Sequence, residues 1–118
     1  VNSDIFGRGL AKVLTCQGAQ VNLVKPSDKN LSARTKQADV LITAIGKKHF
    51  IKKNMVKDGV VVVDIGITRE GKKVYGDVDP AVRNKASYLT PVPGGIGPLT
   101  IAMLFKNTLA LYKKRRGL

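Results

Sequence analysis

Two near-continuous apolar runs dominate the hydrophobic pattern of this chain. The first covers Ala38–Ile45 and ends at Gly46, and the second covers Val60–Ile65 and ends at Gly66. Strands that are apolar at successive positions are buried on both faces, which is typical of parallel sheets. A shorter β-prone run at Gln20–Val24 predicts one more strand before them.

The segments around these runs alternate with them as helices. Leu31–Gln37 and Phe50–Lys57 are predicted as short helices, one before each apolar strand. This order predicts one α/β domain with a mostly parallel sheet and right-handed crossovers. The remaining expected elements are a helix over Gly7–Thr15, a hairpin or loop at Gly71–Gly76, a short helix at Asp79–Lys85 with Pro80 in its first turn, and a last strand at Ser87–Thr90.

The segment Thr90–Thr100 holds three prolines and three glycines in eleven residues. An apolar helix from Leu99 or Thr100 to Tyr112 is predicted to follow it. Proline fixes the backbone, glycine lets the backbone approach a ligand closely, and a helix N-terminus offers unpaired amides. The segment is therefore interpreted as a rigid ligand-binding loop, with a plain connector as the alternative.

Composition fits a single domain of 118 residues with a net charge of +13. The basic residues form separated pairs, apart from one block at Lys113–Arg116. Only three Phe and three Tyr are present, and none is interleaved with the basic pairs, as binding to single-stranded nucleic acid would require. A solvated lysine-rich surface is the simpler interpretation, and its field would still favour a phosphate-bearing ligand.

Cysteine and histidine are too few for metal or disulfide chemistry. Cys16 is the single cysteine and His49 the single histidine, so neither a zinc site nor an internal disulfide is expected. His49 is interpreted as a surface or cofactor-edge side chain. The apolar runs are too short to span a bilayer and no signal peptide is recognisable, so no membrane contact and a cytoplasmic location are expected. The chain opens at Val1 without methionine, which suggests a fragment.

Five segments together resemble one enzyme family over nearly the whole chain. They are Ser3–Gly7, Ala44–Gly46, Asp64–Ile67, Gly76–Val78 and, most specifically, Thr90–Thr100. The chain resembles the C-terminal NAD(P)-binding domain of bifunctional methylenetetrahydrofolate dehydrogenase/methenyltetrahydrofolate cyclohydrolase. The resemblance implies that residues 1–118 form a Rossmann-type domain with a mostly parallel sheet and flanking helices.

The resemblance also implies what lies outside this chain. The first, central strand of a 3-2-1-4-5 sheet would precede Ser3, between the strands at Val21 and Val60, and would leave a gap there. The N-terminal folate-binding catalytic domain is absent, and with it the lysine and tyrosine that catalyse the reaction, so no catalytic residue is expected here and this chain alone would be inactive. The parent would oxidise 5,10-methylenetetrahydrofolate with NADP, or NAD, hydrolyse the methenyl product to 10-formyltetrahydrofolate, and form a homodimer.

Functional residues follow from the resemblance position by position. It places Ser3 beside the cofactor phosphates, Gly46 under the adenosine half and Ile67 near the nicotinamide. The junction of nicotinamide and folate would be lined by the cofactor-binding Thr100 and by the substrate-binding Pro93, Gly94 and Gly97.

Some positions depart from the family pattern. Val1 and Asn2 stand where the family usually has glycine and a phosphate-gripping arginine, and Lys25 and Pro26 replace a usual His-Ser pair. Lys25 supplies a cation that could serve a 2′-phosphate. The choice between NADP and NAD therefore stays open, and a catalytically inactive dinucleotide-binding homologue and a basic polyanion-binding protein remain as alternatives.

Two aspartates flank the expected cleft. Asp64 ends the second apolar run and Asp77 lies in the Gly76–Val78 segment. Asp64 is predicted to anchor the strand end by accepting hydrogen bonds from the backbone, since no second carboxylate stands at a helical or strand spacing that would pair with it.

Overall fold

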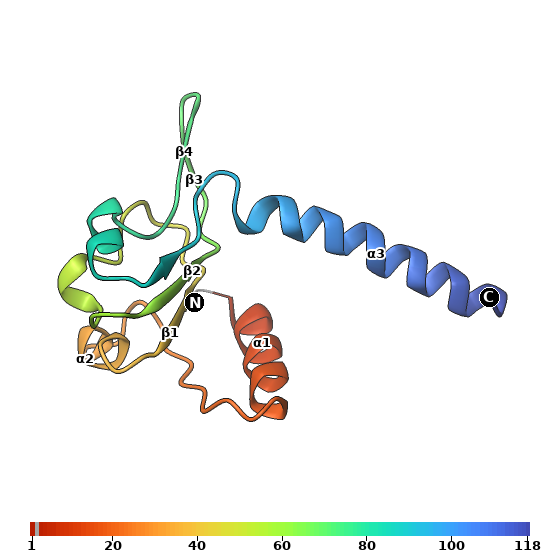
Figure 1. Ribbon diagram of the computed structural model, residues 1–118, viewed down its shortest axis with the longest axis horizontal. Helices are drawn as coiled ribbons and strands as arrows, with labels where there is room; N and C mark the ends of the chain where they lie inside the picture. Colours follow the sequence, from red (N-terminus) through yellow and green to blue (C-terminus); the bar gives the residue numbers. More distant parts are fainter. Residues whose placement is uncertain (2) are drawn as a thin grey trace.

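A three-stranded parallel sheet forms the centre of the computed structural model, which describes residues 1 and 3–118 (Figure 1). Its order is β1–β2–β5, with bounds Val40–Thr43, Val61–Asp64 and Tyr88–Leu89. Both neighbouring pairs are parallel, and Thr43 lies opposite Asp64 at the carboxyl end. The α/β class and the parallel arrangement of the two apolar runs are therefore confirmed.

The expected strand order is wrong. Strand β1 pairs with β2 directly over four residues, so no space remains beside β2 for a strand between it and the segment at Val21. Strand β5 occupies the other edge of β2. Both edges of the most buried strand are thus satisfied within the chain, and the described sheet is continuous.

The predicted strand at Gln20–Val24 is also wrong. The segment has no regular secondary structure. The carbonyl oxygen of Val24 accepts a hydrogen bond from the N-terminal ammonium of Val1, at 3.1 Å. A strand exists only when a neighbour supplies its hydrogen-bond ladder, and β propensity alone does not supply one.

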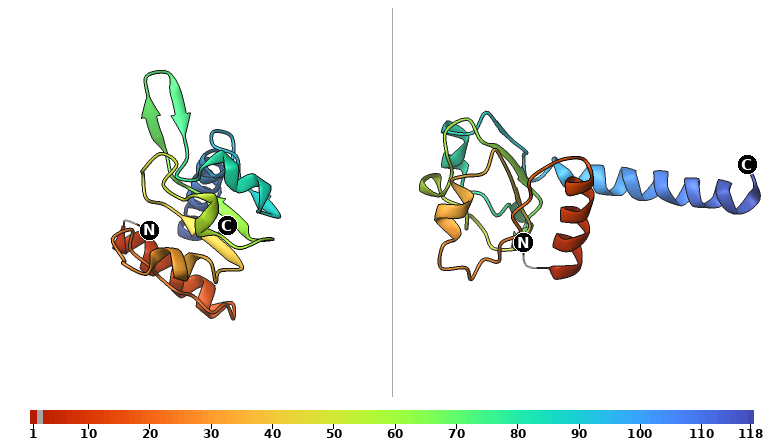
Figure 2. Two further views of the ribbon diagram at one scale, coloured as in Figure 1. Left: turned by 90° about the vertical axis from the view of Figure 1, so that its left-hand side faces the viewer. Right: turned by 90° about the horizontal axis from the view of Figure 1, so that it is seen from below.

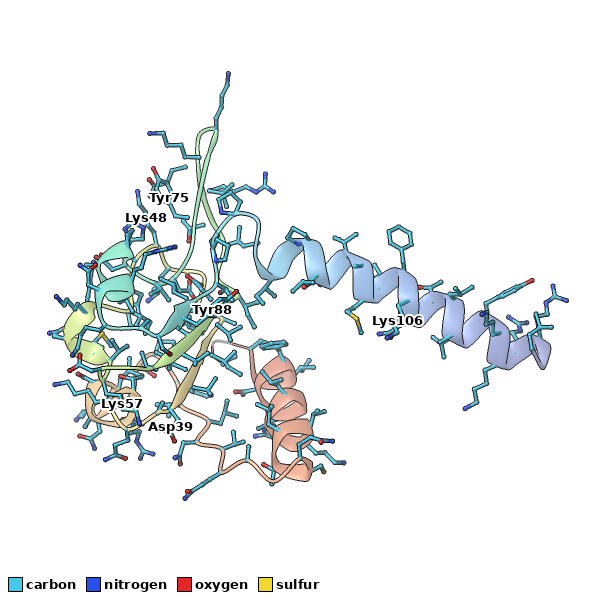
Figure 3. All side chains as sticks on the ribbon, in the orientation of Figure 1. Asp39, Lys48, Lys57, Tyr75, Tyr88 and Lys106 are labelled. Carbon is cyan, nitrogen blue, oxygen red and sulfur yellow. The ribbon has the colours of Figure 1, made fainter. Side chains whose placement is uncertain are left out.

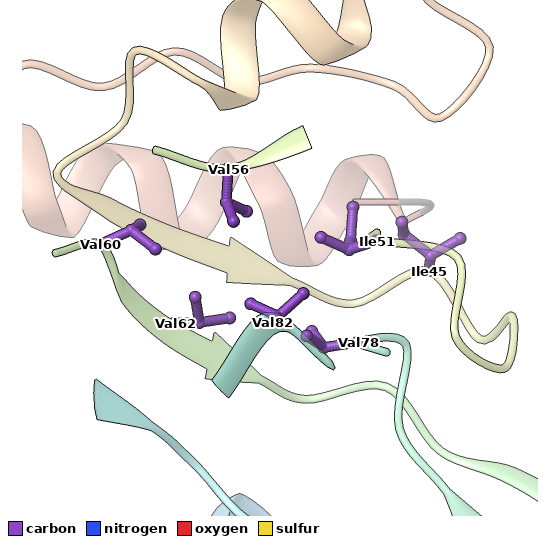
Figure 4. Packing of buried hydrophobic residues seen from close by; sticks show 7 residues of the cluster. All are labelled: Ile45, Ile51, Val56, Val60, Val62, Val78 and Val82. Atoms are coloured by element: carbon purple, nitrogen blue, oxygen red, sulfur yellow. The ribbon is translucent and has the colours of Figure 1, made fainter. Parts of the chain in front are cut away.

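One face of the sheet carries the core, which Figure 4 shows from close by. The side chains of Val60 and Val62 are fully buried, whereas Val61 and Val63 are only half-buried. The apolar runs predicted strands that are buried on both faces, but the second face of β2 is only partly covered. The reason is that the longest helix, which could cover it, projects away from the sheet (Figure 1). The full set of buried hydrophobic residues is Ile45, Ile51, Val56, Val60, Val62, Val78 and Val82.

Of the two short helices predicted before the apolar strands, only one forms as an α-helix. Helix α2, Leu31–Thr35, forms as expected, but Phe50–Lys57 contains only the 3₁₀ turn η1, Lys53–Met55. The reason is that Ile51 is extended and bridges Val78 in parallel, bonded to the backbone on either side of it. The chain can turn helical only after this pairing ends.

The other elements agree with their predicted positions. Strands β3, Thr68–Glu70, and β4, Lys73–Tyr75, form an antiparallel hairpin that turns at Gly71, where φ is +58°. The 3₁₀ helix η2, Pro80–Asn84, begins after Asp79, whose carboxylate accepts from the amide of Ala81.

Two long helices flank this body. Helix α1, Asp4–Cys16, is capped by Ser3, and helix α3, Ile96–Arg116, begins three residues before the predicted Leu99. Helix α3 and the β3–β4 hairpin project from the body in different directions (Figures 1 and 2). No residue of α3 is buried.

Candidate functional site

The carboxyl edge of the sheet gathers the loops that the sequence singled out. Because β1, β2 and β5 are parallel, their last residues meet at this edge. Gly46 follows the end of β1 by three residues, Ile67 follows the end of β2 by three, and the proline-glycine loop follows β5. Open α/β sheets bind ligands outside this edge.

A fully buried carboxylate holds the turn after β1. Oδ2 of Asp77 accepts from Thr43 Oγ1 at 3.0 Å and from the amide of Ile45 at 2.5 Å. Its Oδ1 accepts from the amides of Gly46 and Lys47, at 2.9 and 3.0 Å. One side chain therefore fixes three successive backbone N–H groups.

A second buried carboxylate holds the turn after β2. Asp64 accepts from the amides of Gly66, Asp77 and Val78, at 3.0, 3.1 and 2.9 Å. The predicted anchoring role is thus confirmed. Burial raises the pKa of Asp64 above its ordinary value, and the nearby Asp77 adds to this, while the three backbone hydrogen bonds oppose it.

Asp77 is the neighbouring carboxylate of Asp64, although its distance along the sequence is neither a helical nor a strand spacing. The β3–β4 hairpin folds back on itself, so that Asp77, thirteen residues along the chain, returns to the end of β2. Two glycines make room for the pair. A Cβ at Gly66 would lie 2.0 Å from Cγ of Asp77, and one at Gly76 would lie 2.1 Å from Oδ2 of Asp64. In the sequence, each aspartate stands close to a glycine, in Asp-x-Gly at 64–66 and in Gly-Asp at 76–77. These two short patterns are the features that could have indicated the close approach.

The first turn of α1 and the segment after Val24 border the same edge. Ser3 Oγ caps α1 by accepting from the amide of Phe6 at 3.3 Å. Asp4 and Lys25 form an exposed ion pair at 3.4 Å. A cleft of about 210 Å³ is lined by Lys25, Pro26, Ser27 and Lys47.

This cleft brings together cations that lie far apart in sequence. Lys25 was expected near it, whereas Ser27 and Lys47 were missed, although Lys47 directly follows the predicted Gly46. The departure at Asn2 lies outside the described residues. A cleft lined by two lysines and a serine suits a phosphate.

The predicted substrate-side residues divide between a loop and a helix. Pro93 and Gly94 are exposed in the loop after β5, where Gly94 has φ +92°. Gly97 and Thr100 lie in the first turns of α3, and the Thr100 hydroxyl donates to the carbonyl of Ile96 at 3.0 Å. Thr100 borders a shallow apolar depression along α3, lined by Ile96, Leu99, Thr100, Met103, Leu104 and Asn107.

The exit of the proline-glycine loop is tied to the backbone at the end of β2. Thr90 Oγ1 accepts from the amide of Asp64 at 2.8 Å, and Cγ2 of Val92 lies 3.0 Å from the place a Cβ would take at Gly76. The proline-glycine loop therefore leaves β5 in a direction set by the same residues that hold the other two turns.

His49 packs against the hairpin. Its ring lies edge-on to Tyr75, with the centroids 5.6 Å apart, and Lys48 Nζ lies 3.6 Å above the same ring (Figure 3). Within residues 1 and 3–118, no three potential ligands from His, Cys, Asp and Glu cluster to hold a metal. No helix in that part of the chain is long and apolar enough to cross a membrane.

The fold and this edge define a nucleotide-binding domain of the Rossmann type. Residues 1–116 match the profile of the tetrahydrofolate dehydrogenase/cyclohydrolase NAD(P)-binding domain, and the chain belongs to this family. The predicted family and fold class are confirmed.

Individual relatives agree with this assignment. The bifunctional protein FolD of Caldanaerobacter subterraneus subsp. tengcongensis is 47% identical over 112 residues, which cover 94% of this chain and 40% of that protein. The crystal structure of the bifunctional enzyme FolD from Campylobacter jejuni superposes with a TM-score of 0.91 at 48% identity, over 98% of this chain and 42% of that one.

A third relative was solved with a cofactor. The methylenetetrahydrofolate dehydrogenase-cyclohydrolase of Trypanosoma brucei, complexed with NADP and an inhibitor, superposes with a TM-score of 0.87 at 31% identity. The match covers 95% of this chain and 41% of that one. The chain thus spans about two fifths of the length of the relatives it matches.

Proposed function

We propose that this chain is the cofactor-binding part of an enzyme of one-carbon folate metabolism. The whole enzyme oxidises 5,10-methylenetetrahydrofolate to 5,10-methenyltetrahydrofolate with NADP and hydrolyses the product to 10-formyltetrahydrofolate. The observation that carries the proposal is the carboxyl edge. There one pair of buried carboxylates holds the two strand-end turns, and the exit of the proline-glycine loop is fixed by the hydrogen bond from the Asp64 amide to the Thr90 hydroxyl.

The residues of this chain bind and orient, and they supply no proton-transferring group. NADP, when bound, supplies the nicotinamide that accepts the hydride. Hydride transfer requires donor and acceptor carbons at contact distance, so the surrounding backbone must be rigid. Gly46 and Ile67 follow strand ends that are hydrogen-bonded to buried side chains, which meets this requirement.

The cleft at Lys25 supports NADP as the cofactor. An adenosine 2′-phosphate carries negative charge that NAD lacks, and Lys25, Ser27 and Lys47 offer two cations and a hydroxyl to it. The phosphate-gripping arginine that the family usually carries is missing from the sequence, and these lysines take over its electrostatic role.

Helix α3 supports a partner domain for this chain. Its large hydrophobic residues are exposed on all sides; among them Leu104, Phe105 and Leu109 are 61%, 72% and 54% exposed. Exposed apolar surface of this extent marks an interface. We assign it to the N-terminal folate-binding catalytic domain of the same protein, which also supplies the catalytic residues.

A graft tests the proposed activity. The matching segment of the Campylobacter jejuni enzyme is replaced by this chain, and NADP reduction is measured with 5,10-methylenetetrahydrofolate. Activity above the host's N-terminal part alone supports the proposal. A Lys72→Ala graft, altered at the exposed hairpin tip, serves as the control that retains full activity. A folded graft that binds NADP without turnover would favour an inactive homologue instead.

Two properties of the whole protein belong to the same proposal. The enzyme is a homodimer, which the projecting hairpin supports, since β3 and β4 pair with each other and offer free outer edges. It is cytoplasmic, which agrees with the exposed free thiol of Cys16. Sedimentation of the complete protein and imaging of a fluorescent fusion test these two statements.

A further inference from the structure

Asp77 is the buried side chain with the most hydrogen bonds at the carboxyl edge, and the proposed function uses it only as a structural support of that edge. It belongs to the segment after the hairpin and not to any of the loops that face the ligand. Its carboxylate nevertheless accepts from one hydroxyl and from three successive amides of the turn after β1. We propose that Asp77 is a positioning residue that sets this turn, residues 45–47, for dinucleotide binding.

The hydrogen bonds fix which side of the turn faces the ligand. The amides of Ile45, Gly46 and Lys47 all point at Asp77, inside the molecule. The opposite side of Gly46 is open: φ is +78°, and nothing lies within 4 Å of the place a Cβ would occupy. Because the donors are engaged inside, the turn presents bare backbone outward, where a flat ring can approach closely.

The same bonds also place one wall of the phosphate-suited cleft. The amide of Lys47 is held by Asp77, and Lys47 lines the cleft together with Lys25. Loss of the carboxylate would therefore disturb two contacts at once, the bare turn and the lysine. The inference rests on the proposed function, because it assumes that the ligand at this edge is a dinucleotide.

A neutral substitute would not reproduce this arrangement. An ionised carboxylate is an acceptor at both oxygens, and four donors surround Asp77. In Asp77→Asn the side-chain NH₂ would face either the Gly46 and Lys47 amides or the Ile45 amide and the Thr43 hydroxyl. A donor would meet donors, and the turn would have to move.

The test compares Asp77→Asn with Val82→Ala in the 118-residue chain. Val82 is a fully buried residue of η2, and its apolar side chain forms no hydrogen bond to the turn, so its truncation lowers stability alone. Dissociation constants for NADP and NAD are measured by calorimetry well below each unfolding midpoint. We expect Asp77→Asn to weaken both by about tenfold or more, which is the effect of a buried hydrogen-bonding group left unpaired. Val82→Ala should stay within about twofold of the wild type. Equal losses in the two variants would overturn the proposal.

A milder variant and a second readout cover the case of poor folding. Thr43→Val removes one donor to the same carboxylate, and we expect it to weaken dinucleotide binding by a few-fold. Amide hydrogen exchange is followed in every variant, and Asp77→Asn should lose protection at residues 45–47 without losing it in β2. If wild-type chain binds no dinucleotide, the proposed function fails, whereas unchanged protection at residues 45–47 in Asp77→Asn contradicts the positioning role itself.

Discussion

Single residues at the carboxyl edge explain why the sequence carries aspartate and glycine where it does. Asp64 and Asp77 are buried side by side, and each accepts hydrogen bonds from backbone amides, with a hydroxyl in addition at Asp77. Gly66 and Gly76 leave the space that the two carboxylates fill. Such sites are costly to build, because buried carboxylates must have every acceptor satisfied.

The raised pKa of Asp64 predicts an unusual pH dependence. Its folded-state pKa lies above the unfolded value, so the folded state binds more protons between the two values and stability falls as pH rises through that window. The free energy of unfolding of the wild type, relative to that of Asp64→Asn, should therefore be larger at about pH 4 than at about pH 7. Urea unfolding of both proteins across this range measures the free energy of unfolding of the wild type minus that of Asp64→Asn. An increase of this difference with rising pH would contradict the raised pKa of Asp64.

The close approach at Gly66 predicts a large cost for one added methyl group. Gly66→Ala puts Cβ 2.0 Å from Cγ of the fully buried Asp77, so the chain should lose about 2–4 kcal/mol of unfolding free energy. Gly9→Ala is the matched control. Gly9 lies in α1 with open space around it, and alanine there should stabilise by about 0.5–1 kcal/mol. Similar effects at both positions in chemical unfolding would refute the packing argument.

The two lysines of the cleft predict cofactor choice. A double variant, Lys25→Ala with Lys47→Ala, removes both cations from around the proposed 2′-phosphate. Binding of NADP should weaken by about tenfold or more, while NAD binding changes by less than about threefold. Lys57→Ala with Lys72→Ala removes the same charge elsewhere on the surface and controls for the general field. A parallel loss of NADP and NAD affinity would show that the cleft does not bind the phosphate.

At the scale of elements, the pattern of apolar positions predicted those structures whose partners lie within the chain. The two apolar runs became β1 and β2 because each finds a parallel neighbour here. The runs at Gln20–Val24 and Phe50–Lys57 were mispredicted, since pairing decides both: the first lacks a neighbouring ladder, and the second is extended by its bridge at Ile51. Long-range pairing is not visible in local periodicity.

Helix α3 predicts a contrast in local stability. Its side chains are not buried, so its stability in this chain depends on its own hydrogen bonds and fraying is easy. Leu104→Gln should change the unfolding free energy of the 118-residue chain by less than about 0.5 kcal/mol, whereas Val62→Ala should cost about 2–3 kcal/mol. In the complete protein, Leu104→Gln should become destabilising. Equal insensitivity in both contexts would mean that α3 contacts no other domain.

At the scale of the molecule, the residues that lie at the carboxyl edge were predicted better from the sequence than the order of the strands in the sheet. Gly46 ends an apolar run that the sequence predicted as a strand, the proline-glycine loop was singled out by its composition, and Ile67 followed from the family resemblance; all three lie at the carboxyl edge because that edge collects the segments that follow parallel strands. The carboxylate pair was not predicted, since Asp64 and Asp77 meet only through the return of a hairpin. Lys47 was missed because its role depends on a cleft made with a segment twenty residues earlier.

Calorimetric titration of NADP and NAD into the 118-residue chain at moderate salt shows whether the carboxyl edge of the sheet binds a dinucleotide. We expect saturable binding to one site, tighter for NADP than for NAD, and lost in the Lys25 and Lys47 double variant. A chain that is folded and binds neither dinucleotide would contradict this expectation. Steeply salt-dependent binding of nucleic acid in place of dinucleotides would assign the positive charge to a polyanion instead.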